Sequence, residues 1–172
     1  MTYENALLAR ALIVAGRRLH ADPMTAAGLA ALDWLIENQT SRAGNLSPIG
    51  NGWWPRSGEK SQFDQQPIEA TALLLAAESA FGVGHEPRYA AAMELAYGWF
   101  LGANDLGCEV AVPDRGACRD GLTADGVNLN EGAESTLMWL IAAEHIRAAR
   151  EARPSDGRRQ VVASTQLAMS TL

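Results

Sequence analysis

The sequence predicts an all-α fold built from antiparallel helical hairpins. Three observations lead to this prediction: five segments have helical periodicity, short and long connections alternate between them, and the chain repeats itself at an offset of 65 residues. The length of 172 residues suits one domain, and a hydrophobic content of 48% is sufficient to fill a core. We therefore expect one helical domain over residues 1–152, followed by a C-terminal tail over 153–172.

The helices are expected in two layers. The second helix opens with Asp22 and Pro23 and the third with Pro67, which agrees with the preference of proline for the first helical turn. The first, third and fifth segments contain long apolar runs and indicate an inner layer, whereas the second and fourth indicate amphipathic outer helices. The predicted ranges are 3–19, 23–38, 67–82, 86–102 and 132–152.

The repeat unit consists of an outer helix, a long loop and an inner helix. Chance agreement in an Ala/Leu-rich chain is the weaker explanation, because unlike residue types match at a single offset. Trp34, Trp99 and Trp139 lie in apolar stripes of predicted helices, so we expect all three in the core. The aligned pairs are Trp34 with Trp99, Pro48 with Pro113, Glu69 with Glu134, Thr71 with Thr136 and, one unit earlier, Glu4 with Glu69.

Composition argues against several classes of function. The 14 basic residues are scattered along a chain of net charge −6, which disfavours a nucleic-acid partner. No apolar run approaches the roughly 20 residues of a membrane helix, and no secretory signal is present, so we expect no membrane partner and a cytoplasmic location. Cys108 and Cys118 match no zinc spacing and are expected as reduced thiols, with a local disulfide as the less favoured alternative. We predict no metal and no cofactor.

Two long connections of about 28 residues each separate the second helix from the third and the fourth from the fifth. If successive helices are antiparallel, both connections emerge at the end where the helices over 67–82 and 132–152 begin. Long connections in a compact domain usually have a functional role. One face is therefore expected to gather most of the polar and aromatic loop residues.

Three stretches resemble a known family. SPIGNGWWPRSGEKSQFDQQPIEA (47–70), WFLGANDLG (99–107) and DGLTADGVNLNEGAESTL (120–137) are similar to the C-terminal helical region of a bacterial family often labelled glycosyltransferase. That region in turn resembles the (α/α) toroids of six-hairpin glycosidases and sugar epimerases. The resemblance implies part of an (α/α) toroid, a saccharide ligand and a carbohydrate-active enzyme of glycosidase-like or glycosyltransferase-associated type. A closed toroid needs twelve helices and five are predicted, so the resemblance also implies either the last part of a longer protein, or a homo-oligomer or a partner chain that completes the ring.

In the toroids that this chain resembles, paired carboxylates perform acid–base chemistry where the inner helices start. The catalytic candidates are therefore Asp64, Glu69 and Glu134. Glu69 and Glu134 occupy the same repeat position in the first turn of an inner helix. The alternative for these two is helix capping and interaction with the helix dipole, which contributes about 0.3–1 kcal/mol. For Asp64 the alternative is capping of the helix entry.

The candidate substrate-binding residues all lie in the two long loops. Indole rings stack on pyranose faces, so we expect either Trp53 or Trp54 to meet the ligand while the other anchors its loop. Arg–Asp pairs in the second loop have structural pairing as their alternative. The remaining candidates are Asn51, Arg56, Gln65, Gln66, Asp120, Asp125, Asn128, Asn130 and Glu131.

The predicted function is therefore binding or processing of a saccharide at a loop face with paired carboxylates. The alternative is a non-catalytic helical repeat scaffold for protein–protein assembly. An isoprenoid-processing toroid ranks last, because the chain has no aspartate-rich motif. The sequence leaves turnover, substrate and stereochemistry open.

Overall fold

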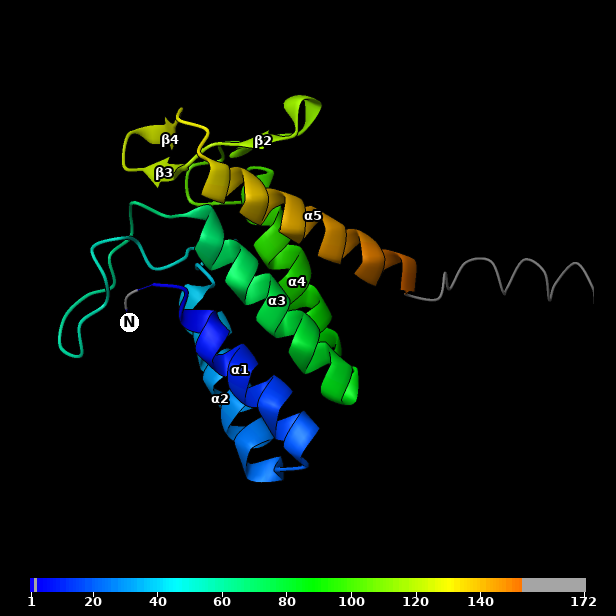
Figure 1. The fold of residues 1–172 in the computed structure, drawn as a ribbon. Helices are drawn as coiled ribbons and strands as arrows, with labels where there is room; N and C mark the ends of the chain where they lie inside the picture. Colours follow the sequence, from blue (N-terminus) through cyan, green and yellow to red (C-terminus); the bar gives the residue numbers. More distant parts are fainter. Residues whose placement is uncertain (2, 153–172) are drawn as a thin grey trace, which may run out of the picture.

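A computed structural model describes residues 1 and 3–152, and the predicted tail over 153–172 lies outside the described residues. Each helix end lies within two residues of the predicted one. Proline stands in the first turn of the second, third and fourth helices, where its missing N–H costs no hydrogen bond. The helices are α1 (Asn5–Leu19), α2 (Asp22–Gln39), α3 (Pro67–Gly84), α4 (Pro87–Phe100) and α5 (Ala133–Ala152), as Figure 1 shows.

The helices form two layers, as Figure 1 shows, with α1, α3 and α5 side by side and with α2 and α4 behind them. α1 packs against α2 and α3 against α4, so the chain runs as successive antiparallel hairpins. The backbone N–H of Glu4 donates to Glu69 in the first turn of α3, and the Tyr3 hydroxyl donates to Glu134 in the first turn of α5. The three inner helices therefore begin at the same end of the molecule.

The connection between α4 and α5 shows that the all-α prediction was wrong. It contains two small antiparallel sheets, each of two strands, which make the described chain a mixed α/β structure rather than part of an all-α toroid. The physical reason is local: Gly116 has a φ of 64° and turns the first hairpin, and Ala124-Asp125 form the turn of the second, directly before Gly126 with a φ of 141°. The strands are β1 (Ala111–Val112), β2 (Ala117–Cys118), β3 (Gly121–Thr123) and β4 (Gly126–Asn128), with a short 3₁₀ helix over Pro113–Arg115.

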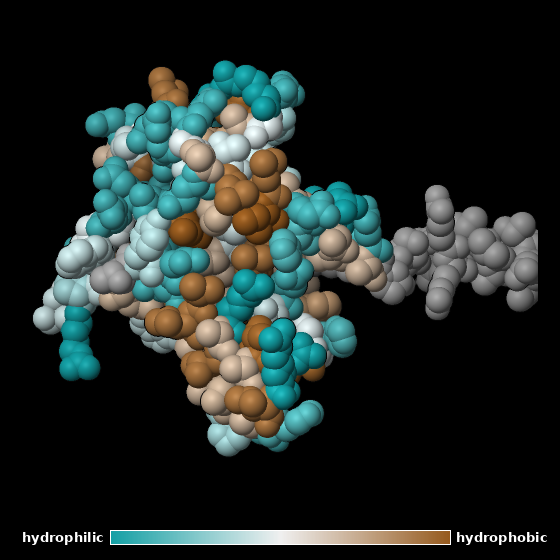
Figure 2. All heavy atoms as spheres, viewed as in Figure 1, coloured by the Kyte–Doolittle hydropathy of each residue, from teal (hydrophilic) through white to brown (hydrophobic). Residues whose placement is uncertain are grey.

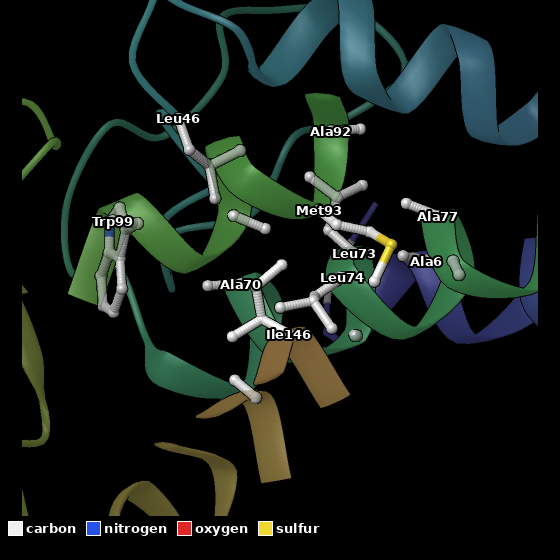
Figure 3. Close-up of a cluster of buried hydrophobic side chains, with 14 of the residues drawn as sticks. Ala6, Leu46, Ala70, Leu73, Leu74, Ala77, Ala92, Met93, Trp99 and Ile146 are labelled. Atoms are coloured by element: carbon white, nitrogen blue, oxygen red, sulfur yellow. The ribbon is translucent and has the colours of Figure 1, made fainter. Parts of the chain in front are cut away.

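The core surrounds α3, whose side chains are buried on most sides, as its nearly continuous apolar run predicts. Figure 3 shows Leu73 and Leu74 of α3 among Met93 of α4 and Ile146 of α5. Burying a side chain of this size contributes about 1.5–3 kcal/mol, so α3 supplies much of the packing energy that holds the neighbouring helices.

Two of the three tryptophans expected in the core are buried there. Trp99 is 0% exposed and Trp139 is 5% exposed. The prediction for Trp34 was wrong, because 43% of its surface is exposed. Its indole lies on the outer layer and stacks on Trp54 of the first long loop, with ring centroids 5.3 Å apart.

Candidate functional site

The two long loops are joined by a short β-bridge next to the start of α3. The backbone N–H of Gln65 donates to the carbonyl of Leu122, and that of Leu122 donates to the carbonyl of Gln65, both at 2.9 Å. Gly121 has a φ of 138°, and a Cβ there would lie 1.9 Å from the Gln65 carbonyl oxygen. Only glycine therefore lets the second hairpin approach the first loop this closely.

The Gln65 side chain is fully buried and fixes the bridge from beneath. Its Nε2 donates to Asp105 at 2.6 Å and to the carbonyl of Gln62 at 2.9 Å, while its Oε1 accepts from the Trp99 indole at 2.9 Å. All the hydrogen-bonding groups of this amide face protein partners. Gln65 is therefore a structural residue whose backbone contributes to the site.

Asp105 connects the same network to the first loop. Ser47 Oγ donates to it at 2.6 Å, and Lys60 lies close enough for its charge to act on the carboxylate. Burial disfavours the charged form, but the hydrogen bonds from Ser47, Asn45 and Gln65 and the Lys60 ammonium outweigh it and lower the Asp105 pKa. This ionised carboxylate ties the loop after α2 to the loop after α4.

A polar hollow of about 370 Å³ lies between the end of the first loop, the β3–β4 hairpin and the start of α5. Six of the predicted site residues line it, and they come from segments far apart in the sequence: Asp64, Gln65, Gln66, Asp120, Asn128 and Glu134. Gly121, Leu122, Thr123, Gly132, Ala133 and Ser135 complete the lining. We name this hollow the polar pocket.

Asp64 offers the polar pocket a carboxylate that no described residue engages. Its side chain is exposed, its backbone carbonyl accepts from the N–H of Asn51 at 3.1 Å, and α3 begins after Gln66 with no side-chain cap. The predicted alternative, capping of the helix entry by Asp64, is therefore not what the structure shows. Both carboxylate oxygens are available to hydroxyl groups of a ligand.

Asp120 has a different role, because it caps the start of α5. Its carboxylate accepts from the backbone N–H of Gly132 at 2.8 Å and from the side chains of Asn130 and Ser135. Burial opposes the charge, but these hydrogen bonds outweigh it and lower the Asp120 pKa. Asp120 and Asn130 thus hold the wall of the polar pocket in place.

Glu134 lies at the edge of the polar pocket and accepts a hydrogen bond of 3.0 Å from Tyr3. Burial, this hydrogen bond and the charges of Glu134, Glu4 and Glu69 raise the Tyr3 pKa to about 12. The three acids that the repeat aligns therefore act on one phenol. Sequence reasoning missed Tyr3, whose only signal was its place next to Glu4.

Glu69 is 4% exposed and does not line the polar pocket. Its carboxylate accepts from the backbone N–H of Glu4 and, at 3.5 Å, from Asn5 Nδ2. Burial raises the Glu69 pKa, and the hydrogen bonds from Glu4 and Asn5 oppose that rise. The structure thus gives Glu69 the capping role that was the alternative, although it serves the start of α1 rather than of α3.

The remaining candidates lie outside the polar pocket. Trp54 is half-buried on Trp34, its Nε1 donates to the carbonyl of Gly58 at 3.3 Å, and Trp53 is 59% exposed. Trp54 therefore anchors the loop, as one of the two was expected to do. Trp54 and Arg56 line a separate hollow of about 320 Å³ on the outer layer. Glu131 pairs with Arg115. The predicted residues that the structure does not bring to the polar pocket are Glu69, Asn51, Trp53, Trp54, Arg56, Asp125, Asn130 and Glu131.

A larger hollow of about 630 Å³ lies at the opposite end of α3. Phe81, Met93 and alanines of α5 line it, together with Glu78 and His85. It contains none of the predicted site residues. Of these two hollows, the polar pocket is the one that gathers the predicted carboxylates and amides.

No protein-family model matches the chain, and no curated protein matches its sequence. The resemblance to the glycosyltransferase-labelled family therefore stays a prediction. Within residues 1 and 3–152, no helix has the length and apolar character to cross a bilayer, and no three His, Cys, Asp or Glu side chains are grouped to hold a metal ion. Cys108 and Cys118 are both free, so the alternative of a local disulfide was wrong.

Proposed function

We propose that the polar pocket binds a saccharide. The observation that supports this proposal is the convergence of Asp64, Gln66, Asn128 and Glu134 on one hollow of about 370 Å³. Ligand pockets span about 300–1,000 Å³, so this volume suits a small sugar unit. Carboxylates and amides are the side chains that accept from and donate to neighbouring hydroxyl groups.

The polar pocket lacks an aromatic side chain among its lining residues, so hydrogen bonds supply the recognition. Neither carboxylate oxygen of Asp64 has a described partner. The Glu134 carboxylate accepts one described hydrogen bond, from the Tyr3 hydroxyl. Asp120 is engaged by three donors and serves the wall. In this proposal Asp64 and Glu134 are consequently the pair that meets the ligand, and they are the acid and base if the bound saccharide is turned over.

The proposal is tested by titrating the full chain with glucose, galactose, mannose, glucuronic acid and their common disaccharides. Binding is followed by thermal shift and by nuclear magnetic resonance of the backbone amides. We expect at least one saccharide to shift the amides of Gln66 and Thr123. Asp64→Asn should weaken its binding about 10–100-fold, because hydrogen bonds to a charged group are worth about 1.5–3 kcal/mol.

Asp125→Asn is the matched control. Asp125 is an exposed aspartate in the turn of the same hairpin and does not line the polar pocket. Asp125→Asn removes the same charge as Asp64→Asn. A loss of saccharide binding in both variants would mean that binding depends only on the general negative potential of the surface. Absence of binding by every saccharide in the panel would refute the proposed function.

A second candidate function is protein assembly, which was the alternative predicted from the sequence. The observation that favours it is a set of exposed leucines on the inner helices, described below. We also propose a cytoplasmic location, because both thiols are unpaired.

A further inference from the structure

The inner helices expose large apolar side chains on the side away from α2 and α4. Leu7 of α1 is 41% exposed and Leu137 of α5 is 54% exposed, and Leu8 and Leu140 are exposed beside them. Figure 2 shows brown surface over the starts of α3 and α5 and again along α1. Contiguous apolar surface of this kind marks a site of association in soluble proteins.

A shallow groove of about 90 Å³ runs between the three inner helices on this side. Leu7 and Leu75 line it together with Met138 and Ile141 of α5. Two charged residues also line it, Glu4 just before α1 and Arg10 within α1, and Thr71 and Ala72 of α3 complete the lining. We name the surface formed by these eight residues and Leu137 the inner-helix face.

The charges on this face are arranged symmetrically about Leu7. Glu4 precedes Leu7 by three residues and Arg10 follows it by three, and all three line the same groove, so charges of opposite sign lie on either side of Leu7. If a second α1 is laid antiparallel across the first at Leu7, Glu4 of each chain meets Arg10 of the other. A two-fold interface requires such self-complementarity, in which residue i contacts j and j contacts i.

We propose that the inner-helix face binds a second copy of this chain in a two-fold dimer, with Leu7 at the axis. The charge pattern selects this occupant, since an antiparallel copy supplies an arginine for each glutamate. The dimer interface then buries Leu7, Leu75 and the apolar side chains of α5, and the Glu4–Arg10 pairs fix the register of the two chains. The inference deepens the second candidate function, protein assembly, and is independent of saccharide binding.

The proposal is tested on the full 172-residue chain by sedimentation velocity and by size-exclusion chromatography with light scattering. We expect a dimer that Leu7→Asp and Leu137→Asp each convert to a monomer. Leu129→Asp is the matched control: Leu129 is 75% exposed, lies in the loop before α5, and should leave the dimer intact. Circular dichroism verifies that each variant is folded.

The charge register has a separate test. Glu4→Arg and Arg10→Glu should each weaken the dimer by about tenfold or more, because each places like charges opposite one another twice. The double variant restores opposite charges and should return the dissociation constant to near the wild-type value. A wild-type monomer at all concentrations, a dimer that survives both leucine substitutions, or a double variant as weak as the single ones would overturn the proposal. A saccharide titration of the monomeric variant separates this failure from failure of the polar pocket.

Discussion

Replacing Gly121 by alanine is expected to break the join between the two long loops. An alanine at position 121 would be held at a φ of 138°, which costs about 1–3 kcal/mol of backbone strain. Its Cβ would also lie 1.9 Å from the Gln65 carbonyl oxygen, so the hairpin must move and both backbone hydrogen bonds to Leu122 are lost. Each bond is worth about 0.5–1.5 kcal/mol, which brings the total to about 2–6 kcal/mol.

Gly126→Ala is the matched control for this prediction. Gly126 opens β4 of the same hairpin with a φ of 141°, and nothing lies within 4 Å of a Cβ built there. It should therefore lose only the strain energy, about 1–3 kcal/mol. Only Gly121→Ala also causes the collision and breaks the bridge, so its free energy of unfolding should be about 1–3 kcal/mol lower than that of Gly126→Ala. This difference corresponds to a urea midpoint about 1 M lower for Gly121→Ala.

The assay is urea unfolding followed by circular dichroism and by tryptophan fluorescence. Trp99 reports directly on the bridge, because its indole donates to Gln65. Gly121→Ala should also abolish saccharide binding at the polar pocket, whereas Gly126→Ala should retain it. Equal destabilisation by the two alanines would refute the argument that close approach at Gly121, rather than its backbone conformation alone, holds the loops together.

Two further predictions concern the carboxylates of Glu69, which is buried, and Asp105, which is half-buried. Glu69→Ala removes the acceptor at the start of α1 and should lower the free energy of unfolding by about 1–3 kcal/mol. Glu69→Gln keeps an acceptor there and should lower the free energy of unfolding by less. Equal decreases in the two variants would contradict the capping role. The lowered Asp105 pKa means that its stabilisation is present above the ordinary value of 3.8 and is lost as pH falls through the lowered folded value. Asp105→Asn should therefore flatten the fall in melting temperature below about pH 4, and an unchanged acid slope would argue against the network.

The helices could be predicted from the sequence because their signals are local. Pro67 starts α3, and its nearly continuous apolar run is explained by burial on most sides. The small sheets could not be predicted from periodicity, because strands of two or three residues are too short to show alternation. The Asp125-Gly126 pair is a typical hairpin signal, but the turn itself falls on Ala124 and Asp125, and the flanking segments lack the apolar alternation that would have supported a hairpin.

The candidate site was predicted in part for a similar reason. Asp64 and Glu134 were expected on one face because both stand at the start of an inner helix, and they do line one hollow. Glu69 occupies the same position in the repeat as Glu134, but the start of α1 packs over Glu69 and buries it. Burial depends on contacts between residues about 65 apart, and sequence position alone does not supply them.

Residues that the 65-residue offset aligns have different contacts in the structure. Thr71 donates to the carbonyl of Met138, which links α3 to α5, whereas its counterpart Thr136 accepts from the backbone N–H of Cys118 in the second loop. Trp99 is enclosed beneath Gln65, and its counterpart Trp34 lies half in solvent on Trp54. Each difference depends on which neighbouring segment packs against that residue. The exposed leucines of α1 and α5 lie on the two helices that flank α3 in the inner layer, and association is the physical means by which such surface is removed from water.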